Sequence, residues 1–311
     1  MTGLPTLLVT MGDAAGIGPE IIVSAFNQGG LSDAVIVGDA AVLRRAGAGM
    51  TAVIDAPADL ATLPMGRIDG RNGAAAARCV EDAVRWVQAG QAAAIVTAPL
   101  HKEALAAAGV PYPGHTEMLQ MLAATPGQPL PPVRMMLAND ELRVVLVTIH
   151  LSLRRALDAV TFDAVLQTLR IAHAAAAAWG QTRPRMAVAG LNPHAGEGGL
   201  FGDEEIRIIG PAVQAAVAEG LDAQGPFAPD TVFMRARRGE FDLVVAMTHD
   251  HGLIPVKYLG VEHGVNVSLG LPFVRTSPDH GTAFDIAGRG QADAASLVAA
   301  AQMARRLVAA R

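Results

Sequence analysis

The stretch Phe241–Tyr258, FDLVVAMTHDHGLIPVKY, decides the fold, because an apolar run ends there abruptly at His249, Asp250 and His251. Short β-branched runs bounded by polar residues are typical of buried strands. Besides Asp242–His249, the chain contains five further runs of this kind: Leu4–Thr10, Asp33–Gly38, Ala92–Pro99, Arg143–His150 and Arg185–Pro193.

Longer segments with helical patterns separate these runs: Pro19–Gln28, Ala74–Ala89, Asp163–Trp179, Glu204–Glu219 and the closing Gln291–Ala310. Such alternation predicts an α/β protein with a largely parallel sheet covered by helices. The length of 311 residues allows two domains or one large α/β unit. The segment Thr125–Val133, TPGQPLPPV, is the best candidate for a hinge between two lobes, because its prolines and glycine disfavour regular structure.

The composition excludes several classes of protein. Hydrophobic residues make up 51% of the chain and charged residues 17%, which excludes general disorder. The net charge of -5 argues against a nucleic-acid-binding surface but permits a small anionic substrate. Cys79 is the only cysteine, so an internal disulfide and a cysteine-based zinc cluster are both excluded. With no signal-peptide pattern and no apolar run of about 18 residues, we expect a cytoplasmic protein without a membrane partner.

Three of the apolar runs finish in histidine, at His150, His194 and His249. Ligands of open α/β sheets bind beyond the carboxyl ends of the strands, so the shared position points to a common site. One histidine after a strand is more often a hydrogen-bonded loop residue than a metal ligand. Three at equivalent positions suit a catalytic metal with one open coordination position, zinc first, with cobalt, nickel or manganese as alternatives.

Two further segments have a functional and a structural interpretation. In YPGHTEML a helix begins at His115 and Thr116; its amide groups suit a phosphate or carboxylate, although simple N-capping by Thr116 explains the pattern equally well. The polar segment Ser277–Gly290 is either a cofactor cradle or a connection.

The segment MGDAAGIGPEI, with Asp13, does not match the dinucleotide-binding motif GxGxxG, and the chain has no GxxxxGK[ST] phosphate loop.

Taken together, the motifs resemble those of the 4-hydroxythreonine-4-phosphate dehydrogenase (PdxA) family. The resemblance runs from about Thr10 to Gly290 through MGDAAGIGPEI, TAPLHKEAL, YPGHTEML, LVTIHLSLR, GLNPHAGEGGLFGDEE, GPFAPDTVF, HDHGLIPVKY and GVNVSLGLPFVRTSPDHGTAFDIAG. That family resembles the isocitrate and isopropylmalate dehydrogenases, whose nucleotide loop is matched here by HGTA and DIAG. The implied fold is two-lobed, three-layer α/β/α, with the active site in the interlobe cleft at a dimer interface. A nucleotide-side lobe would span residues 1–128 and 270–311, and a metal, substrate and dimerisation lobe residues 129–269.

The resemblance also implies residue roles. His150, His194 and His249 would bind one divalent metal ion, contributed from both subunits of a homodimer, with zinc favoured and magnesium, cobalt, manganese or nickel as alternatives. The substrate would be contacted by His115, Thr116, Lys257, Asn266 and Arg275. NAD or NADP would be contacted by His280, Gly281, Thr282, Ala283 and Asp285, with Asp13 also assigned to the cofactor side. Lys257 and Asp250 are the candidates for accepting the proton of the alcohol.

The implied reaction is the NAD-dependent, metal-dependent oxidation and decarboxylation of 4-phosphooxy-L-threonine to 3-amino-2-oxopropyl phosphate, a step in pyridoxal phosphate biosynthesis. Two alternatives stay open: the same chemistry on another substrate, such as a phosphorylated threonate or erythronate or a cyclic diol carboxylate, and a metal- or ligand-binding protein without turnover. One departure concerns His251, where the family usually has glutamine. We expect a role beside the metal ligands for His251, because three ligands are already supplied.

Overall fold

The computed structural model describes residues 7–47, 49, 53–55, 59–176, 181–260 and 263–310. The chain divides into two compact units. The first contains the described residues of Met1–Val133 and Leu271–Val308, and the second those of Arg134–Gly270 and Ala309–Arg311. The first boundary falls at the end of the proline-rich segment Thr125–Val133, which follows a helix of the first unit.

The first unit has strands β1 (Leu7–Thr10), β2 (Ala34–Gly38), β3 (Val53–Asp55), β4 (Ala94–Thr97) and β11 (Val274–Pro278). Its helices are α1 (Gly18–Asn27), α2 (Ala40–Arg45), α3 (Gly70–Gln88), α4 (Lys102–Ala107), α5 (His115–Leu122) and α11 (Ala295–Ala309). The strands pair in the order β3-β2-β1-β4-β11, and all of these pairs are parallel. The carboxyl ends of the strands therefore share one edge.

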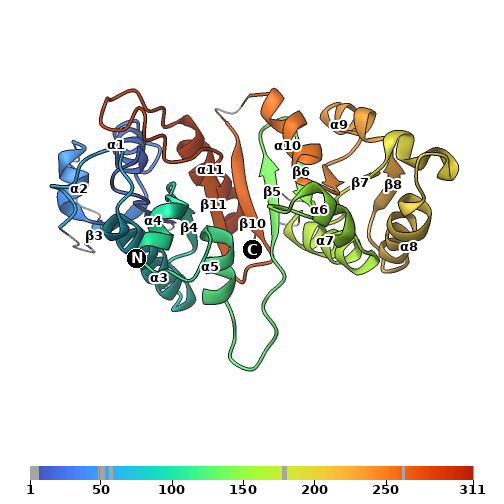
Figure 1. Ribbon diagram of the computed structural model, residues 1–311, viewed down its shortest axis with the longest axis horizontal. Coiled ribbons are helices and arrows are strands. Elements are labelled where there is room, and N and C mark those ends of the chain that lie inside the picture. The colour runs from blue at the N-terminus through green and yellow to red at the C-terminus, as the bar shows by residue number, and fades with distance from the viewer. Residues whose placement is uncertain are drawn as a thin grey trace. The chain divides into compact units, whose positions relative to one another are not determined.

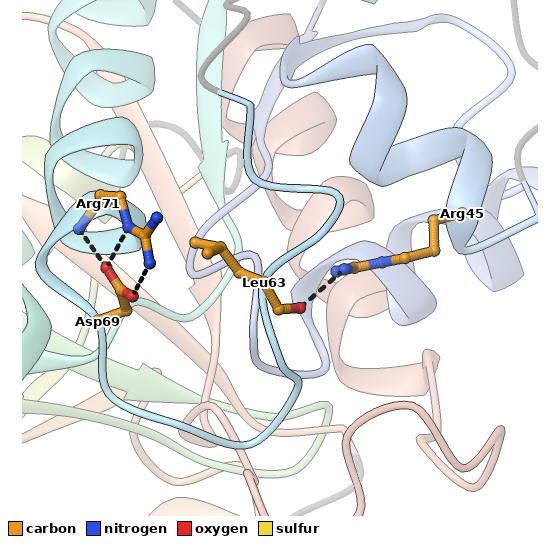
Figure 2. A network of polar contacts seen from close by, with 4 residues as sticks. All are labelled: Arg45, Leu63, Asp69 and Arg71. Carbon is orange, nitrogen blue, oxygen red and sulfur yellow. Dashed lines mark hydrogen bonds and ion pairs between the residues drawn. The ribbon is translucent and has the colours of Figure 1, made fainter.

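Helices cover both faces of the sheet in the first unit (Figure 1). On one face, Leu8 and Ile95 belong to a buried cluster that includes Val80 of α3 and Leu119 of α5. On the other face, the Thr276 hydroxyl donates a 2.8 Å hydrogen bond to the carbonyl of Ala300 in α11. Helix α3 begins at an exposed cap, where the Asp69 carboxylate accepts from the Arg71 amide (2.8 Å) and pairs with its guanidinium (Figure 2).

The second unit has strands β5 (Arg134–Ala138), β6 (Arg143–Leu146), β7 (Met186–Ala189), β8 (Ala223–Phe227), β9 (Leu243–Ala246) and β10 (Val265–Leu269). Its helices are α6 (Leu153–Ala159), α7 (Phe162–Ala176), α8 (Gly210–Ala218), α9 (Pro229–Arg237) and α10 (His249–Tyr258), with the short helical segments η2 (Pro193–Gly199) and η3 (Glu205–Ile209). The strand order is β10-β5-β6-β9-β7-β8. Strand β5 is antiparallel to both neighbours, and the pairs from β6 to β8 are parallel.

The sheet of the second unit is also covered on both faces (Figure 1). Val144 and Val244 form a buried cluster with Phe233 of α9 and Leu253 of α10. On the opposite face, the Arg134 guanidinium of β5 donates a 2.7 Å hydrogen bond to the Thr168 hydroxyl of α7. Each unit is thus a helix–sheet–helix sandwich, and the predicted α/β class is confirmed. None of the helices in the described part of the chain is long and apolar enough to cross a membrane.

All six predicted strands contain an observed strand, and the predicted helices correspond to α1, α3, α7, α8 and α11. Residues Ala177–Trp179 of the predicted Asp163–Trp179 helix lie outside the described residues. The clearest difference is helix α10, which starts at His249 and is not among the predicted helices. Its apolar residues Leu253 and Val256 pack against the sheet.

Candidate functional site

Three neighbouring parallel strands of the second unit each lead to one of the predicted histidines. Strand β9 lies between β6 and β7, with Leu146 paired to Ala246 and Val188 to Val245. The chain beyond β6, β9 and β7 then reaches His150, His249 and His194 in turn. The three histidines therefore follow the same edge of one sheet.

Backbone bonds beyond the strand ends bring His150 and His249 together. The Thr148 amide and hydroxyl both donate to the carbonyl of Met247, at 3.2 and 2.8 Å. The ring centroids of His150 and His249 are 5.6 Å apart, and both residues line a cavity of about 380 Å³. The Nδ1 atom of His249 lies 2.8 Å from the Asp250 carboxylate. This contact leaves Nε2 as the nitrogen of His249 that can bind a metal.

The environment of His194 differs from that of His150 and His249. It belongs to η2, where it has a φ of 52°, and its ring centroid is 6.0 Å from that of Phe201. It lines a second cavity of about 670 Å³ with Asp230 and His251, and burial lowers the pKa of His251. Among the described residues, no three His, Cys, Asp or Glu side chains are grouped closely enough to hold a metal ion. One chain thus brings together two of the three predicted ligands.

The other predicted residues of the second unit lie on or beside α10. Asp250 is in the first turn, with its side chain 83% exposed. Lys257 is exposed in the last turn, seven positions later and so about 10 Å along the helix axis on nearly the same side. Asn266 is half-buried in β10 opposite Leu137, on the sheet face that α10 covers.

In the first unit, the predicted anion-binding residue Arg275 is buried, and His115 and Thr116 are half-buried. Arg275 of β11 is only 3% exposed and donates a 2.6 Å hydrogen bond to the Thr97 hydroxyl at the end of β4. Burial lowers the pKa of Arg275 to about 10, so it remains a cation at neutral pH. His115 starts α5; burial, followed by the charge of Arg275, lowers its pKa well below the usual range. A cation and a neutral imidazole thus occupy the same part of this unit.

The structure tests one of the two interpretations of the α5 N-terminus, the capping by Thr116. The N-cap residue is Gly114, in an extended conformation, and no side chain caps the helix. The N-capping interpretation of Thr116 is therefore wrong, and Thr116 is a half-buried residue of the first turn. The Nε2 atom of His115 is fully buried and has no hydrogen-bond partner among the described residues. Both features leave the anion-binding interpretation in place.

The predicted cofactor loop, His280–Gly288, packs against the first glycine-rich segment. The Ile17 amide donates to the Thr282 carbonyl (3.0 Å), and a Cβ at Gly16 would lie 2.9 Å from that oxygen. Glu20 accepts from the Gly288 amide. Asp13 is fully buried, and this burial raises its pKa although the Ala15 amide donates to it.

In this loop, His280, Gly281, Ala283 and Asp285 remain partly or fully exposed. Ala283 has a φ of 42°, and the ring of Phe284 stacks on His101 at 4.7 Å. His101, whose role the sequence alone did not indicate, is thereby placed beside the loop.

Arg45 of α2 holds the segment that faces this loop. Its guanidinium donates to the carbonyls of Ala61 (2.7 Å), Leu63 (3.2 Å) and Ala14 (3.1 Å). Figure 2 shows the reach of Arg45 to Leu63. A little further on, Met65 packs on Gly288. The sequence does not predict this role of Arg45, because its partners are backbone carbonyls, which every residue type carries.

Comparisons with known proteins find similar proteins over nearly the whole chain. The family model described as "Pyridoxal phosphate biosynthetic protein PdxA" matches residues 30–304. A 4-hydroxythreonine-4-phosphate dehydrogenase of Beijerinckia indica is 53% identical, covering 97% of this chain and 94% of that protein. A D-threonate 4-phosphate dehydrogenase of Pectobacterium atrosepticum is 45% identical, covering 97% and 98%. The solved structure of a 4-hydroxythreonine-4-phosphate dehydrogenase from Klebsiella pneumoniae is 44% identical, covers 97% of this chain and 99% of that one, and has a TM-score of 0.87. The chain belongs to the PdxA family.

Proposed function

We propose that this protein is an NAD- and divalent-metal-dependent dehydrogenase that oxidises and decarboxylates 4-phosphooxy-L-threonine to 3-amino-2-oxopropyl phosphate, in pyridoxal phosphate biosynthesis. The observation that carries the proposal is the delivery of His150, His249 and His194 to one sheet edge by three neighbouring parallel strands. The 53% identity to a 4-hydroxythreonine-4-phosphate dehydrogenase supports the substrate. Loss of carbon dioxide after oxidation would give the ketone named as product.

The metal would be held by His150 and His249 of one copy and His194 of a second copy. Two imidazoles at 5.6 Å, one of them oriented by a carboxylate on Nδ1, fit two ligands of a zinc-type site. In the described part of one chain the three histidines are not grouped closely enough to hold one ion, which supports a contribution of His194 to a neighbouring copy. When bound, such an ion lowers the pKa of a substrate hydroxyl and stabilises negative charge that develops during decarboxylation.

The anionic ends of the substrate would be bound by residues with cationic or donor groups. In the first unit, Arg275 supplies a fixed charge and His115 a neutral imidazole, with Thr116 beside it. A guanidinium is suited to phosphate and carboxylate because its N–H groups form a planar fork. In the second unit, Lys257 and Asn266 would each add a hydrogen-bonding group.

The proton of the alcohol has two candidate acceptors on α10, Lys257 and Asp250. The contact of Asp250 with His249 favours an orienting role for this carboxylate. We therefore assign proton transfer to Lys257 and the orientation of the imidazole to Asp250.

NAD would accept the hydride from the alcohol carbon. We assign the binding of NAD to the loop from His280 to Asp285, with Asp13 on the same side. The packing of this loop against Gly16 and Ile17 supports the assignment, because it fixes the loop backbone before any ligand binds. NADP is the alternative cofactor, and the assay described below compares it with NAD.

A second substrate has specific support. The D-threonate 4-phosphate dehydrogenase of Pectobacterium atrosepticum is 45% identical over nearly the whole of both chains. D-threonate 4-phosphate carries a hydroxyl where 4-phosphooxy-L-threonine carries an amine, so the phosphate and carboxylate contacts would be common to both. The preference for one of the two substrates would depend on the residue that contacts the amine or the hydroxyl.

The experiment is an assay of NADH formation by the purified full-length protein. It would use 4-phosphooxy-L-threonine, D-threonate 4-phosphate and D-erythronate 4-phosphate, each with NAD or NADP, before and after treatment with a chelator and after the return of zinc. We expect the highest kcat/KM with 4-phosphooxy-L-threonine and NAD, and loss of activity with chelator that zinc restores. Preference for another substrate would replace the proposed one, and full activity after chelation would refute the metal requirement.

A further inference from the structure

The loop that carries His194 has an unusual backbone. Three residues with side chains, His194, Ala195 and Glu197, have φ values of 52°, 52° and 43°. Gly196 and Gly198 between and after them also have positive φ. Residues with a Cβ rarely adopt the left-handed region because of steric repulsion, so such a run persists only where the surroundings hold it. The question is which group holds this loop.

Glu205 is that group. Its side chain is buried, with the residue only 4% exposed, at the start of η3. Oε1 accepts hydrogen bonds from the amides of Leu191 (2.7 Å) and Asn192 (2.8 Å), and Oε2 accepts from the Asn192 side-chain amide (2.9 Å). Burial alone would raise the pKa of this carboxyl, but the donated hydrogen bonds lower it. A buried carboxylate thus ties down the two residues with which the loop begins.

The loop backbone also passes close to Glu205 on both sides of His194. A Cβ built on Gly190 would lie 3.0 Å from Oε1, and a Cβ on Gly196 would lie 2.8 Å from Oε2. The approach is possible only because both positions are glycine. Gly190 precedes His194 by four positions and Gly196 follows it by two. The backbone on either side of His194 is therefore shaped around one carboxylate.

We infer that Glu205 is a positioning residue for the metal site: it holds the His194 loop in the left-handed form that presents the imidazole to the metal. The inference rests on the proposed function, in which His194 is a ligand. Glu205 itself touches neither metal nor substrate and acts through the backbone of Leu191 and Asn192. Groups that orient a metal ligand are commonly worth about 10- to 100-fold in metal affinity.

The neighbouring Glu204 provides a matched control. It has the same charge, is half-buried, and accepts one hydrogen bond, from the Asn192 side chain at 2.7 Å. It accepts none from the loop backbone in the contacts described for it. Glu204→Gln therefore changes charge and a side-chain contact at the same place, while leaving the two backbone bonds of Glu205.

The experiment measures Co²⁺ binding to the full-length protein by calorimetry and by visible absorption, without NAD or substrate. The variants are Glu205→Gln, Glu205→Ala, Glu204→Gln and His194→Ala, and the melting temperature of each is recorded. We expect Glu205→Gln to weaken Co²⁺ binding by about 10-fold and to change the absorption spectrum, since a neutral amide oxygen accepts more weakly than a carboxylate. Glu205→Ala should weaken it by up to about 100-fold, and Glu204→Gln by less than about 2-fold, because the two backbone bonds of Glu205 remain. If Glu205→Ala does not fold, Glu205→Gln decides, because it keeps the size of the side chain.

The outcomes separate this inference from the proposed function. Weaker binding and an altered spectrum in Glu205→Gln, with Glu204→Gln unchanged, support the positioning role. Binding by Glu205→Gln equal to that of the unsubstituted protein, with His194→Ala impaired, overturns the positioning role and leaves the metal site standing. If His194→Ala binds Co²⁺ as tightly as the unsubstituted protein, the ligand assignment fails and this inference fails with it.

Discussion

The proposed substrate-binding residues of the first unit are less exposed than the residues that we propose for metal binding and proton transfer in the second. In the first unit, Arg275 is 3% exposed and bonded to Thr97, and burial shifts the pKa of both Arg275 and His115. In the second unit, the Asp250 side chain is 83% exposed, the His249 side chain is 39% exposed, and Lys257 is also exposed. One unit holds its charged groups in place before any ligand arrives. The other presents its ionisable groups at an exposed surface.

This difference suggests a division of labour. A buried, hydrogen-bonded cation costs little further ordering when it binds an anion, so the first unit is suited to recognition of phosphate or carboxylate. Exposed imidazoles and a lysine are suited to meet a metal ion, a substrate or a second copy of the chain. Substitutions of the buried Arg275 and of His115 should therefore affect stability as well as binding, whereas substitutions of the exposed residues of the second unit should leave stability unchanged.

The largest effect is expected for Lys257→Ala. Loss of a general base lowers kcat by about 1000-fold, and the exposed position predicts an unchanged melting temperature. The measurement is steady-state kinetics with calorimetric melting. Lys257→Arg is the matched variant, because arginine keeps the charge but does not release its proton. Near-normal turnover in Lys257→Arg would show that Lys257 supplies charge and not proton transfer.

Arg275→Ala should reduce kcat/KM by about 100-fold, since truncating one member of a buried charged contact typically costs 2–5 kcal/mol. Unlike Lys257→Ala, it should also lower the melting temperature, because the Thr97 hydroxyl loses its partner in the sheet. Arg289→Ala, an exposed arginine at the end of the cofactor loop, is the control and should change neither quantity. An Arg275→Ala protein with unaltered KM and stability would contradict the comparison of the two units.

The pH dependence of stability tests the burial of His115. Its folded-state pKa is lowered well below the ordinary 6.5, so below that pH the unfolded chain binds more protons. The contribution of His115 to the free energy of unfolding is thus present above about pH 6.5 and decreases as the pH falls, by up to about 1.4 kcal/mol per pH unit. Denaturant titrations of the unsubstituted protein and of His115→Asn between about pH 7.5 and pH 5 should converge at the lower pH. Parallel curves would show that His115 titrates normally.

The smallest effect is expected for Arg45→Ala. The substitution removes three hydrogen bonds from the Arg45 guanidinium to backbone carbonyls. Because the Arg45 side chain is exposed, these bonds contribute little, and NADH binding should weaken by only about 3- to 10-fold as the cofactor loop loosens. The fluorescence of bound NADH would report the dissociation constant. Arg44→Ala is the control, because this exposed neighbour has the same charge and helix position. Equal effects of the two substitutions would point to general electrostatics rather than to the loop contacts.

The sequence predicted the strands and the residues at their ends more fully than the contacts that position them. Apolar runs ending at His150, His194 and His249 follow from local periodicity, and that part of the fold is confirmed. The roles of Glu205 and Arg45 depend on bonds to backbone amides and carbonyls from other segments, and no residue pattern records such bonds. Helix α10 was missed because its buried residues Leu253 and Val256 are too few to give a helical period.

The central claim is that His150 and His249 of one copy and His194 of a second copy bind one metal ion. The most direct measurement is anomalous scattering from a crystal of the full-length protein grown with zinc. We expect one strong peak about 2.0–2.1 Å from a ring nitrogen of each of these three histidines, with His194 coming from the other copy. A peak bound by other residues, or a zinc-soaked protein with these three imidazoles beyond coordinating distance of one another, would contradict it.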